Sequence, residues 1–568
     1  MFLSFSNVNA QKPSFNFRQF KNWAISSRWL VILAALYFTT ILNLSLWRYL
    51  IDHIELTGFK MVIFAFSFPV VIFCAMTFFF SLITLPYVTK PLLIILTISS
   101  SATNYLMFNL GIVIDADMIR NVMETNVREA SDLITANAII WVLITGIIPA
   151  IGIGITKINY SPWLQELKSR SITIALSAVI VGLIAGAFYK EYATFGRNNK
   201  PLLKLINTTN YLHAIFRYYR IVAMADQTFT ILDEDAQLLP YPDTTPTVLI
   251  LVLGETARAD HFSLNGYKHN TNPELSKENI ISFKNVLSCG TATNISVPCM
   301  FSDITRKDFS SRDQVQNREN LLDLLQRAGY DIIWLENDDG CKGVCKRVQT
   351  ENLFKSNHPK YCSSDGSCYD EILLDGLEQR IANLKKNSVI VLHTIGSHGP
   401  TYYKRYPDTF RKFTPTCDTA DLQKCSQEEI INTYDNTILY TDYIVANAIK
   451  TLKKFPKLES GLIYISDHGE SLGENNIYLH GMPYSIAPQS QKHVPMVFWM
   501  SDRMKKQDHL DFKCIEKKAE ENNFSHDNLF STLLALLEVN STTYNKSLDI
   551  LDSCRTEPLP TKTTQNKS

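Results

Sequence analysis

The chain has 568 residues, of which 46% are hydrophobic, and its 55 Lys and Arg balance its 55 Asp and Glu. At roughly 100–200 residues per domain, this length allows two to four domains. The lack of a basic excess argues against a dedicated nucleic-acid binder. With 31 Phe and 25 Tyr, the chain is also far too apolar to be disordered.

Five long apolar runs all fall before residue 190. Each is close to the roughly 20 residues that cross a ~30 Å hydrocarbon layer, and none carries a charged residue. One such run could be a buried core helix, but five in succession predict a transmembrane domain of five helices over residues 1–190. A cleaved signal peptide does not fit, because the first run starts too late and is too long. The runs are Trp29–Trp47, Met61–Ile83, Leu92–Leu110, Ala136–Ile155 and Ile172–Phe188.

The charges that flank these runs predict their orientation. Residues 1–28 contain four basic residues and no acidic one, so the N-terminus is expected in the cytoplasm. The segment between the third and fourth runs is rich in acidic residues and is expected outside. Five crossings then place everything after residue 190 in the periplasm.

Cysteine usage fits this topology. Of 11 Cys, only Cys74 precedes residue 190. Zinc knuckles are an alternative for the other ten, but they require C-x-x-C spacing, which does not occur here. Close pairs suit disulfides in an oxidising compartment. The four close pairs are Cys289 with Cys299, Cys341 with Cys345, Cys362 with Cys368, and Cys417 with Cys425, and Cys514 with Cys554 could form a fifth.

Residues 191–245 form a bridge between the two halves. An amphipathic helix on the membrane surface and an ordinary linker helix both fit its aromatic and basic segment Tyr211–Tyr219. The bridge ends in the turn-rich segment Leu239–Asp243.

Residues 246–568 alternate short apolar strands with helical stretches. The strands are apolar on both faces, which is typical of the centre of a parallel sheet covered by helices. Strand and helix in alternation predict an α/β/α sandwich. The predicted strands are Thr247–Leu253, Asp331–Leu335, Ser388–His393, Gly461–Ser466 and Val494–Trp499.

Four of these strands are followed by polar side chains that can bind a metal. In open α/β sheets, sites form where the strands end at their carboxyl side, so these groups are expected in one cleft. Imidazole and carboxylate both bind Zn²⁺. The groups are Glu255, the segment Glu336–Asp339, His393 with His398, and Asp467 with His468.

The segment Cys289–Cys299 supplies candidate nucleophiles in Thr291, Thr293 and Ser296. Two cysteines would clamp this loop, and a helix starting in it could direct backbone N–H groups at an anion. A threonine hydroxyl is a poor nucleophile at neutral pH, but coordination to zinc would activate it.

These residues resemble the phosphoethanolamine transferases of Gram-negative inner membranes, which include lipid A-modifying enzymes and the mobile colistin-resistance enzymes. The resemblance covers essentially the whole chain, including the five membrane spans. It implies a catalytic domain of the alkaline phosphatase/sulfatase type. The segments that carry it are Gly254–Asp260 (GETARAD), Cys289–Cys299 (CGTATNISVPC), His398–Pro400 (HGP), Ser466–Ser471 (SDHGES) and Tyr478–Gly481 (YLHG).

The resemblance also implies roles for single residues. Glu255, Thr293, Asp467 and His468 would hold the catalytic zinc, with Thr293 as the nucleophile. His398 and His480 would lie beside this zinc and contact the phosphoryl group, a second zinc or the leaving oxygen. Lys342 would meet the substrate phosphate, and Asn121, Thr125 and Glu129 would bind the donor head group. Asn121, Thr125 and Glu129 are spaced to share one face of a helix.

The implied function is transfer of phosphoethanolamine from phosphatidylethanolamine to a lipid A phosphate through a covalent threonine intermediate. Diacylglycerol would leave, and the modified lipopolysaccharide would confer polymyxin resistance. The expected enzyme is a monomer of the inner membrane that uses Zn²⁺ and binds no nucleic acid.

Other readings stay open. The same chemistry on lipopolysaccharide core heptose or Kdo, or transfer of phosphoglycerol, would use the same fold. A sulfatase-type hydrolase would need a formylglycine precursor motif, which is absent around Thr293. A non-catalytic membrane scaffold is disfavoured because no expected ligand is missing.

Overall fold

The computed structural model describes residues 24–124, 127–224, 228–239, 245–309, 311–356, 358–363 and 366–557. The chain divides into two compact units. The first, here the helical unit, comprises Met1–Tyr105 and Ile139–Thr208, and the second, here the sheet unit, comprises Leu106–Ala138 and Thr209–Ser568. The segment between the third and fourth membrane helices therefore groups by its contacts with the sheet unit.

Five helices are long and apolar enough to cross a membrane, as the sequence predicts. Large apolar side chains along them are exposed, among them Phe66, Ile95 and Leu183, which is expected of surfaces that face lipid. The spans are Ser27–His53 (α1 Ser27–Thr40 and α2 Leu44–His53), α3 Phe59–Ile83, α4 Thr89–Asn109, Ala136–Ile155 (α7 Ala136–Val142 and α8 Ile148–Ile155) and α9 Trp163–Ala187.

Two further helices follow the last span. α10 (Tyr189–Asn198) packs Tyr192 against Phe64 and Phe68 of α3, and the Tyr192 hydroxyl hydrogen-bonds to Ser67 at 2.7 Å. α11 (Asn207–Met224) begins at the boundary between the units. The first half of the predicted bridge is therefore helical, and α10 is packed against a membrane helix.

An eight-stranded sheet in the order β13-β5-β12-β9-β4-β8-β6-β7 forms the centre of the sheet unit. The neighbours β9, β4, β8 and β6 run parallel, as the sequence predicts. β12 was expected to be parallel too, but it runs antiparallel to both β9 and β5. It is buried on both faces because it lies inside the sheet, and burial does not report strand direction. The strands are β4 Thr247–Gly254, β5 Ile280–Leu287, β6 Asp331–Glu336, β7 Gln349–Asn352, β8 Ser388–His393, β9 Glu459–Ser466, β12 His493–Met500 and β13 Phe524–Ser525.

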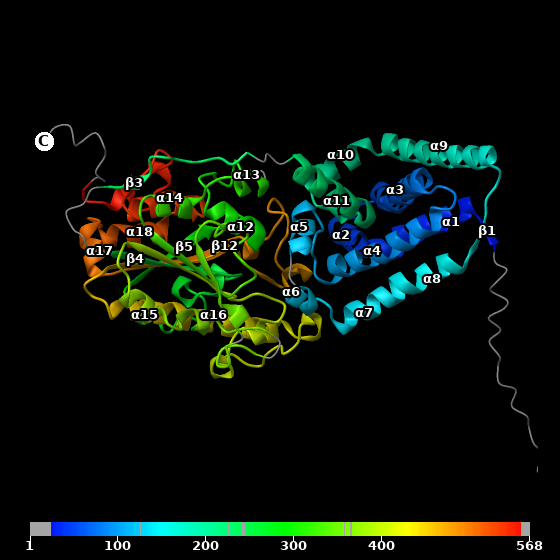
Figure 1. The fold of residues 1–568 in the computed structure, drawn as a ribbon. Coiled ribbons are helices and arrows are strands. Elements are labelled where there is room, and N and C mark those ends of the chain that lie inside the picture. The colour runs from blue at the N-terminus through cyan, green and yellow to red at the C-terminus, as the bar shows by residue number, and fades with distance from the viewer. Residues whose placement is uncertain are drawn as a thin grey trace, which may run out of the picture. The chain divides into compact units, whose positions relative to one another are not determined.

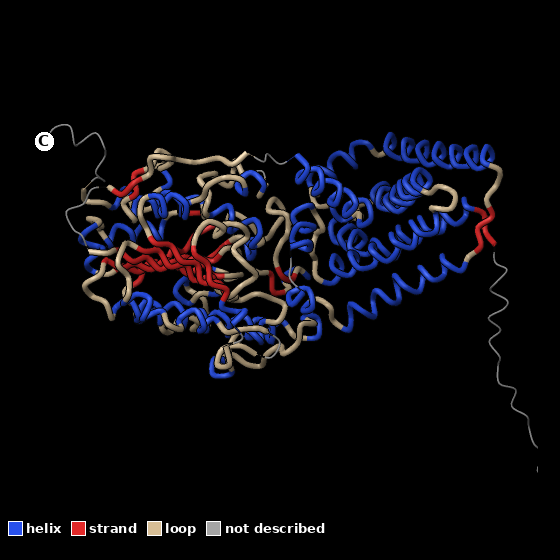
Figure 2. The backbone as a smooth tube through the Cα atoms, in the orientation of Figure 1, coloured by secondary structure: helices blue, strands red, loops and turns tan. Residues whose placement is uncertain are grey.

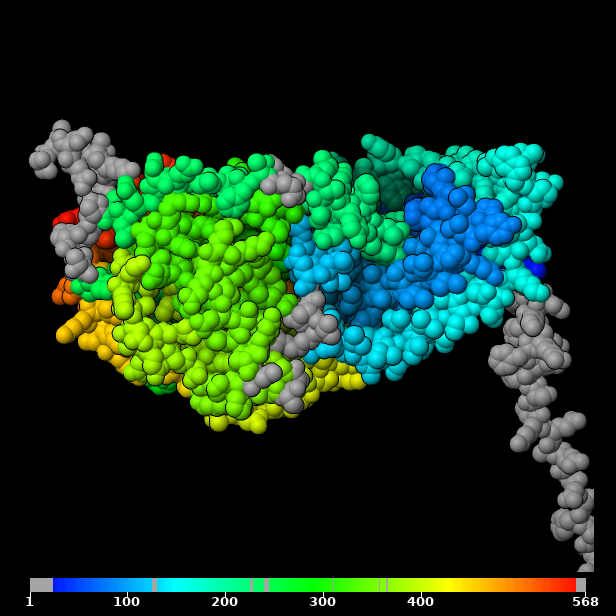
Figure 3. Space-filling model, in the orientation of Figure 1, coloured from blue at the N-terminus to red at the C-terminus, as the bar shows by residue number. Residues whose placement is uncertain are grey.

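Helices cover both faces of this sheet, which makes the unit an α/β/α sandwich (Figures 1 and 2). One face carries α12, α14 and α18, and the other carries α15 and α16. Every residue of β4 is buried. Figure 3 shows the outer surface that this unit presents in the same view. The helix bounds are α12 Thr293–Met300, α14 Leu321–Arg327, α15 Leu377–Ala382, α16 Gln427–Lys453 and α18 Phe512–Glu521.

The sheet unit contains five disulfides. All 11 cysteines lie in the described residues, and Cys74 is the one that stays free. The four close pairs form as predicted, and the pair left open, Cys514 and Cys554, is bonded as well. The four predicted bridges join Cys289 to Cys299, Cys341 to Cys345, Cys362 to Cys368, and Cys417 to Cys425.

Each predicted bridge closes a loop beside an element of the sheet unit. The bridges at Cys289 and Cys341 close the loops that carry Thr293 and Lys342. The backbone oxygen of Cys368 accepts a hydrogen bond from the Asn337 side chain at 3.1 Å, just after β6. Cys425 directly precedes Ser426, the residue that caps the N-terminus of α16. The bridges therefore restrain loops that begin or end next to strands and helices.

Replacing both Cys514 and Cys554 with serine is expected to destabilise the sheet unit by about 2–4 kcal/mol. The bridge closes a long loop, with a sequence separation of 40, so its removal restores freedom to the unfolded chain. The urea midpoint of the purified full chain, followed by tryptophan fluorescence, measures this. Cys74→Ser is the matched control, and equal midpoints for the double variant and the wild type would contradict the expectation.

Candidate active site and metal centre

The parallel strands bring their polar ends to one edge of the sheet. Gly254, the last residue of β4, is level with Ser466 of β9, and Glu255 and Asp467 follow these two residues. On the other side of β4, Leu253 is level with His393, the last residue of β8. The ends of these strands therefore lie at one edge of the sheet, because neighbouring parallel strands end at the same level.

Thr293 is the first residue of α12 and lies over this edge. Its Oγ1 donates a hydrogen bond to Glu255 Oε2 at 3.0 Å and lies 3.4 Å from His468 Nε2. The tight turn before it requires Gly290, because a Cβ there would lie 2.8 Å from the backbone nitrogen of Ser296. Ser296 in turn donates to the backbone oxygen of Asp467 at 2.5 Å, which ties α12 to the end of β9.

Two buried carboxylates and an imidazole converge beside Thr293. His468 Nε2 lies 3.3 Å from Glu255 Oε1 and 3.4 Å from Asp467 Oδ2, and neither oxygen has a hydrogen-bond partner among the residues that the structure describes. The Nδ1 of His468 faces the backbone oxygen of Gly469 at 2.9 Å, so Nε2 is the nitrogen presented to the carboxylates. Burial and the nearby charge of Asp467 raise the pKa of Glu255 well above its ordinary value. A divalent cation would compensate these charges and use these atoms, so the residues fit a metal.

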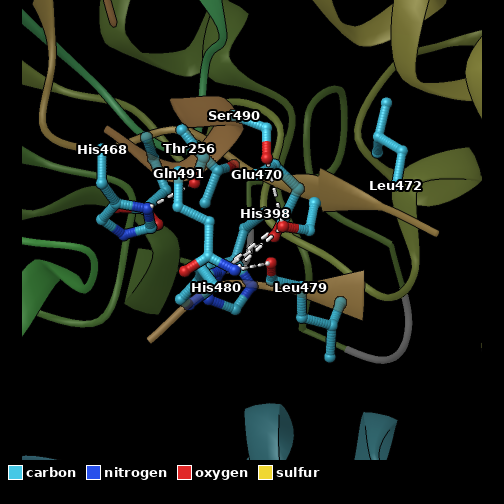
Figure 4. A network of polar contacts seen from close by, with 12 residues as sticks. Thr256, His398, His468, Glu470, Leu472, Leu479, His480, Ser490 and Gln491 are labelled. Atoms are coloured by element: carbon cyan, nitrogen blue, oxygen red, sulfur yellow. Dashed lines mark hydrogen bonds and ion pairs between the residues drawn. The ribbon is translucent and has the colours of Figure 1, made fainter. Parts of the chain in front are cut away.

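His480 and His398 lie next to this centre (Figure 4). The His480 ring centroid is 4.4 Å from that of His468 and 5.4 Å from that of His398. Burial lowers the pKa of His480. Its Nδ1 lies 3.3 Å from Oε1 of the buried Glu470, which orients the ring. Sequence analysis assigned no role to Glu470, although it lies inside the Ser466–Ser471 motif.

A short hairpin delivers His480. The strands β10 (Ser471–Leu472) and β11 (Tyr478–Leu479) pair just before it. The buried amide of Gln491 holds this hairpin, donating to the Leu479 backbone oxygen at 3.0 Å and to the Ser471 hydroxyl at 2.9 Å (Figure 4).

One pocket connects Thr293 to the segment between the third and fourth membrane helices. Asn121, predicted to bind the donor head group, lies in α5 (Ala116–Glu124) and lines this pocket. Thr125 lies outside the described residues. Glu129 lies in α6 (Val127–Asp132), but its side chain is outside the described part of the structure. The residues that line the pocket are Asn121, Glu124, Thr293, Asp338, Asp339, Lys342, His398 and His480.

Arg312 links α5 to the loop that carries Lys342. Its Nη1 pairs with Glu124, and its Nη2 donates to the Lys342 backbone oxygen at 2.8 Å. Lys342 has a φ of 50°, a left-handed conformation that few non-glycine residues adopt, so this contact helps to hold it. Its Nζ donates to the Asp339 backbone oxygen at 2.9 Å, next to the pocket.

Two further arginines fasten the same segment. Arg120 pairs with Asp313 at 2.5 Å, with little solvent exposure of either side chain. Arg405 lies 3.5 Å from Asp132 at the end of α6 and donates to the backbone oxygen of His398 at 2.8 Å. The segment is therefore tied to the loops that carry Lys342 and His398.

Replacing Arg312 with methionine is expected to slow transfer by about 10–100-fold, because Lys342 and Glu124 lose a shared anchor. Steady-state kinetics of the full chain measure this loss. The variants Arg312→Met, Glu124→Gln and their combination form a double-mutant cycle, and we expect a coupling of about 0.5–3 kcal/mol. Additive effects within about 0.3 kcal/mol would show that the pair does not act together.

Comparison with known proteins identifies the family. The model for "Phosphoethanolamine transferase EptA/EptB" matches residues 72–221, and the sulfatase model matches residues 247–539. The chain is 44% identical to phosphoethanolamine transferase EptA of Escherichia coli K12 over 533 residues, which cover 93% of this chain and 96% of that protein. The chain belongs to the phosphoethanolamine transferase family.

Further relatives agree with this assignment. Phosphatidylethanolamine transferase Mcr-1 of Escherichia coli is 36% identical over 491 residues, covering 84% of this chain and 88% of that protein. The solved integral membrane lipooligosaccharide phosphoethanolamine transferase A of Neisseria meningitidis superposes with a TM-score of 0.91 at 40% identity, covering 94% of this chain and 99% of that structure. The chain is thus an inner-membrane phosphoethanolamine transferase with five transmembrane helices and a periplasmic domain of the sulfatase type.

Proposed function

We propose that this enzyme transfers phosphoethanolamine from phosphatidylethanolamine to a phosphate of lipid A, through a covalent phosphoethanolamine intermediate on Thr293 and with bound zinc. One observation carries the proposal. The Thr293 hydroxyl lies within 3.4 Å of both Glu255 and His468 in a buried, negatively charged centre. Of the candidate nucleophiles Thr291, Thr293 and Ser296, Thr293 is the one that lines the pocket shared with Lys342, His398 and His480.

The zinc ligands proposed are Glu255, Asp467, His468 and Thr293. Carboxylate and imidazole donors at these separations suit Zn²⁺, and the charges of Glu255 and Asp467 match the charge of one divalent ion. Bound zinc would supply Lewis acidity, lowering the pKa of the threonine hydroxyl and neutralising charge on the phosphodiester.

The chain's own residues perform the remaining tasks. Thr293 loses its hydroxyl proton to solvent, its Oγ1 attacks the phosphorus of the donor, and the bond to diacylglycerol breaks. His480 or His398 donates a proton to the leaving oxygen, a role suited to an imidazole. Lys342 binds the phosphate, and Asn121, with Thr125 and Glu129, binds the ethanolamine. A lipid A phosphate then attacks the phosphorus and releases Thr293.

The acceptor is proposed from the relatives' names and from chemistry. The Neisseria meningitidis relative is named for a lipooligosaccharide acceptor. A relative named Kdo(2)-lipid A phosphoethanolamine 7''-transferase is only 28% identical, over 71% of this chain, so lipid A phosphate is preferred to Kdo. The added ammonium group offsets negative charge on lipid A, which would weaken binding of cationic polymyxins. All proposed site residues come from one chain, so a monomer suffices.

The test is to incubate the purified full chain with phosphatidylethanolamine in the absence of acceptor. We expect release of about one diacylglycerol per chain, and peptide mapping should locate phosphoethanolamine on Thr293. Mapping separates Thr293 from Thr291 and Ser296 in the same loop. Release of diacylglycerol without a labelled residue, or a label on another hydroxyl, would contradict the covalent step.

A further inference from the structure

A second buried cluster of metal-binding groups adjoins Glu255 on the side away from Asp467. It consists of Glu336 at the end of β6, Asp338 two residues later and His393 at the end of β8. Asp338 has 3% of its surface exposed, and Glu336 and His393 have none. Single ligand atoms of Glu255, Asp338 and His393 all lie within 4.8 Å of one another. The proposed transfer mechanism uses neither Asp338 nor His393.

Glu336 fixes which nitrogen His393 presents to this cluster. The Nδ1 of His393 lies 2.9 Å from the Glu336 carboxylate. The same carboxylate accepts hydrogen bonds from Trp334 Nε1 and from the backbone N–H of Asp338, both at 2.8 Å. A histidine held in this way by a carboxylate carries its proton on Nδ1 and offers Nε2 to a metal.

The Nε2 of His393 is fully buried and has no hydrogen-bond partner in the described part of the chain. It faces Asp338 Oδ2 at 3.8 Å, which is too long for a hydrogen bond. Two ligands of one tetrahedral zinc, each about 2.1 Å from the ion, lie roughly 3.4 Å apart. The gap between these atoms is therefore close to the separation expected of two ligands that share an ion.

The sum of the charges in this cluster also favours a bound metal ion. Glu255 and Asp467 together carry two negative charges, which one divalent ion in the proposed catalytic site would match. Glu336 and Asp338 then leave two more negative charges in the buried cluster. A protonated His393 would supply one positive charge and leave one uncompensated, whereas a divalent ion beside a neutral His393 brings the sum to zero.

We propose that Glu255, Asp338 and His393 bind a second divalent transition-metal ion of the zinc class, with Glu255 shared between the two ions and Glu336 positioning His393. Asp338 also lines the pocket that contains Thr293, so this site borders the reacting atoms. Paired ions on either side of a shared carboxylate are a known way to stabilise phosphoryl transfer. The site does not rest on the proposed acceptor or on the threonine intermediate, because an inactive protein can still bind the ion.

Metal analysis of the full chain tests the assignment. The protein is purified in detergent, loaded with Zn²⁺ and dialysed against chelator-treated buffer. We expect about two zinc ions per wild-type chain and about one in a His393→Gln variant. The matched control is His261→Gln, because His261 is another buried histidine held by a carboxylate, with its Nδ1 2.7 Å from Asp435 Oδ1. This control should retain about two ions.

Anomalous diffraction at the zinc edge from wild-type crystals keeps the test decisive if His393→Gln does not fold. We expect two peaks, one of them within about 2.1 Å of His393 Nε2. A single peak beside His468, or equal zinc content in the wild type and His393→Gln, would overturn the second site and indicate a protonated His393. If the wild-type protein shows both zinc peaks but transfers no phosphoethanolamine to lipid A, the proposed function is contradicted and the second metal site still stands.

Discussion

In a Thr293→Ala variant, transfer of phosphoethanolamine is expected to fall by about three orders of magnitude or more. The change removes the only hydroxyl that contacts Glu255 and His468 among the described residues, so no group remains in place to attack the donor. The residual rate would come from binding and charge stabilisation alone. Release of diacylglycerol from phosphatidylethanolamine, measured under single-turnover conditions, isolates this first step.

Thr293→Ser is the matched control, since it keeps the hydroxyl and loses only a methyl group. We expect it to retain activity within about 10–100-fold of the wild type. Far-ultraviolet circular dichroism should be unchanged in both variants, because Thr293 lies at the first position of α12 rather than in its interior. Retention of near wild-type activity by Thr293→Ala would remove this residue from the mechanism.

An Asp467→Asn variant is expected to lose metal affinity by about 10–100-fold or more, yet to be more stable than the wild type when both are metal-free. In the metal-free wild type, Asp467 raises the pKa of the buried Glu255, and histidines are the positive groups beside this pair among the described residues. The asparagine keeps the Oδ1 that accepts from His468 N at 2.7 Å and from Thr256 N at 3.3 Å. It also gains an amide donor beside Glu255.

Thermal melts with excess zinc and with chelator measure both effects. Relative to the wild type, we expect the Asp467→Asn melting temperature to be about 2–4 °C higher in chelator and lower in zinc. Asp331→Asn, an exposed carboxylate at the start of β6, controls for a general change of charge. A lower melting temperature of Asp467→Asn in chelator would contradict the repulsion between Asp467 and Glu255.

The sequence predicts the elements whose pattern is local. Five apolar runs of membrane length become five spanning helices, and four doubly buried runs become the parallel strands β4, β6, β8 and β9. The direction of β12 could not be predicted, because it depends on which neighbours it pairs with. β5 alternates buried and partly exposed residues, so it lacks the continuous apolar signal of the central strands.

Whether a disulfide could be predicted depends on how far apart its two cysteines lie in the sequence. Cysteines four to ten positions apart, such as Cys362 with Cys368 and Cys417 with Cys425, could be paired from spacing alone. Cys514 and Cys554 are 40 positions apart, so spacing could not decide their pairing. Their approach depends on how the segment after α19 (Asp527–Leu536) returns to α18.

The grouping of residues 106–138 with the sheet unit also depends on contacts that are distant in sequence. Arg120 pairs with Asp313, and Glu124 pairs with Arg312, nearly 200 positions away. Neither arginine belongs to a motif, so nothing local distinguishes these pairs from ordinary surface charges.

The residues of the candidate site also differ in whether the sequence alone could assign them. Glu255, Thr293, Asp467 and His468 stand in motifs or directly after strands, and the structure brings all four together. Glu470 was not assigned, because its role depends on where the hairpin before His480 folds back. His393 was recognised as a metal-capable group at a strand end, but its tautomer depends on Glu336, which only the pairing of β6 with β8 places beside it.

Mass spectrometry of lipid A tests the central claim most directly. Lipid A is extracted from cells that express the wild-type chain or Thr293→Ala at equal levels in the membrane. The proposed function predicts a phosphoethanolamine addition to lipid A with the wild type only. Unmodified lipid A in both strains, with the wild-type protein folded and zinc-loaded, would contradict lipid A as the acceptor, and modification in both strains would contradict Thr293 as the nucleophile.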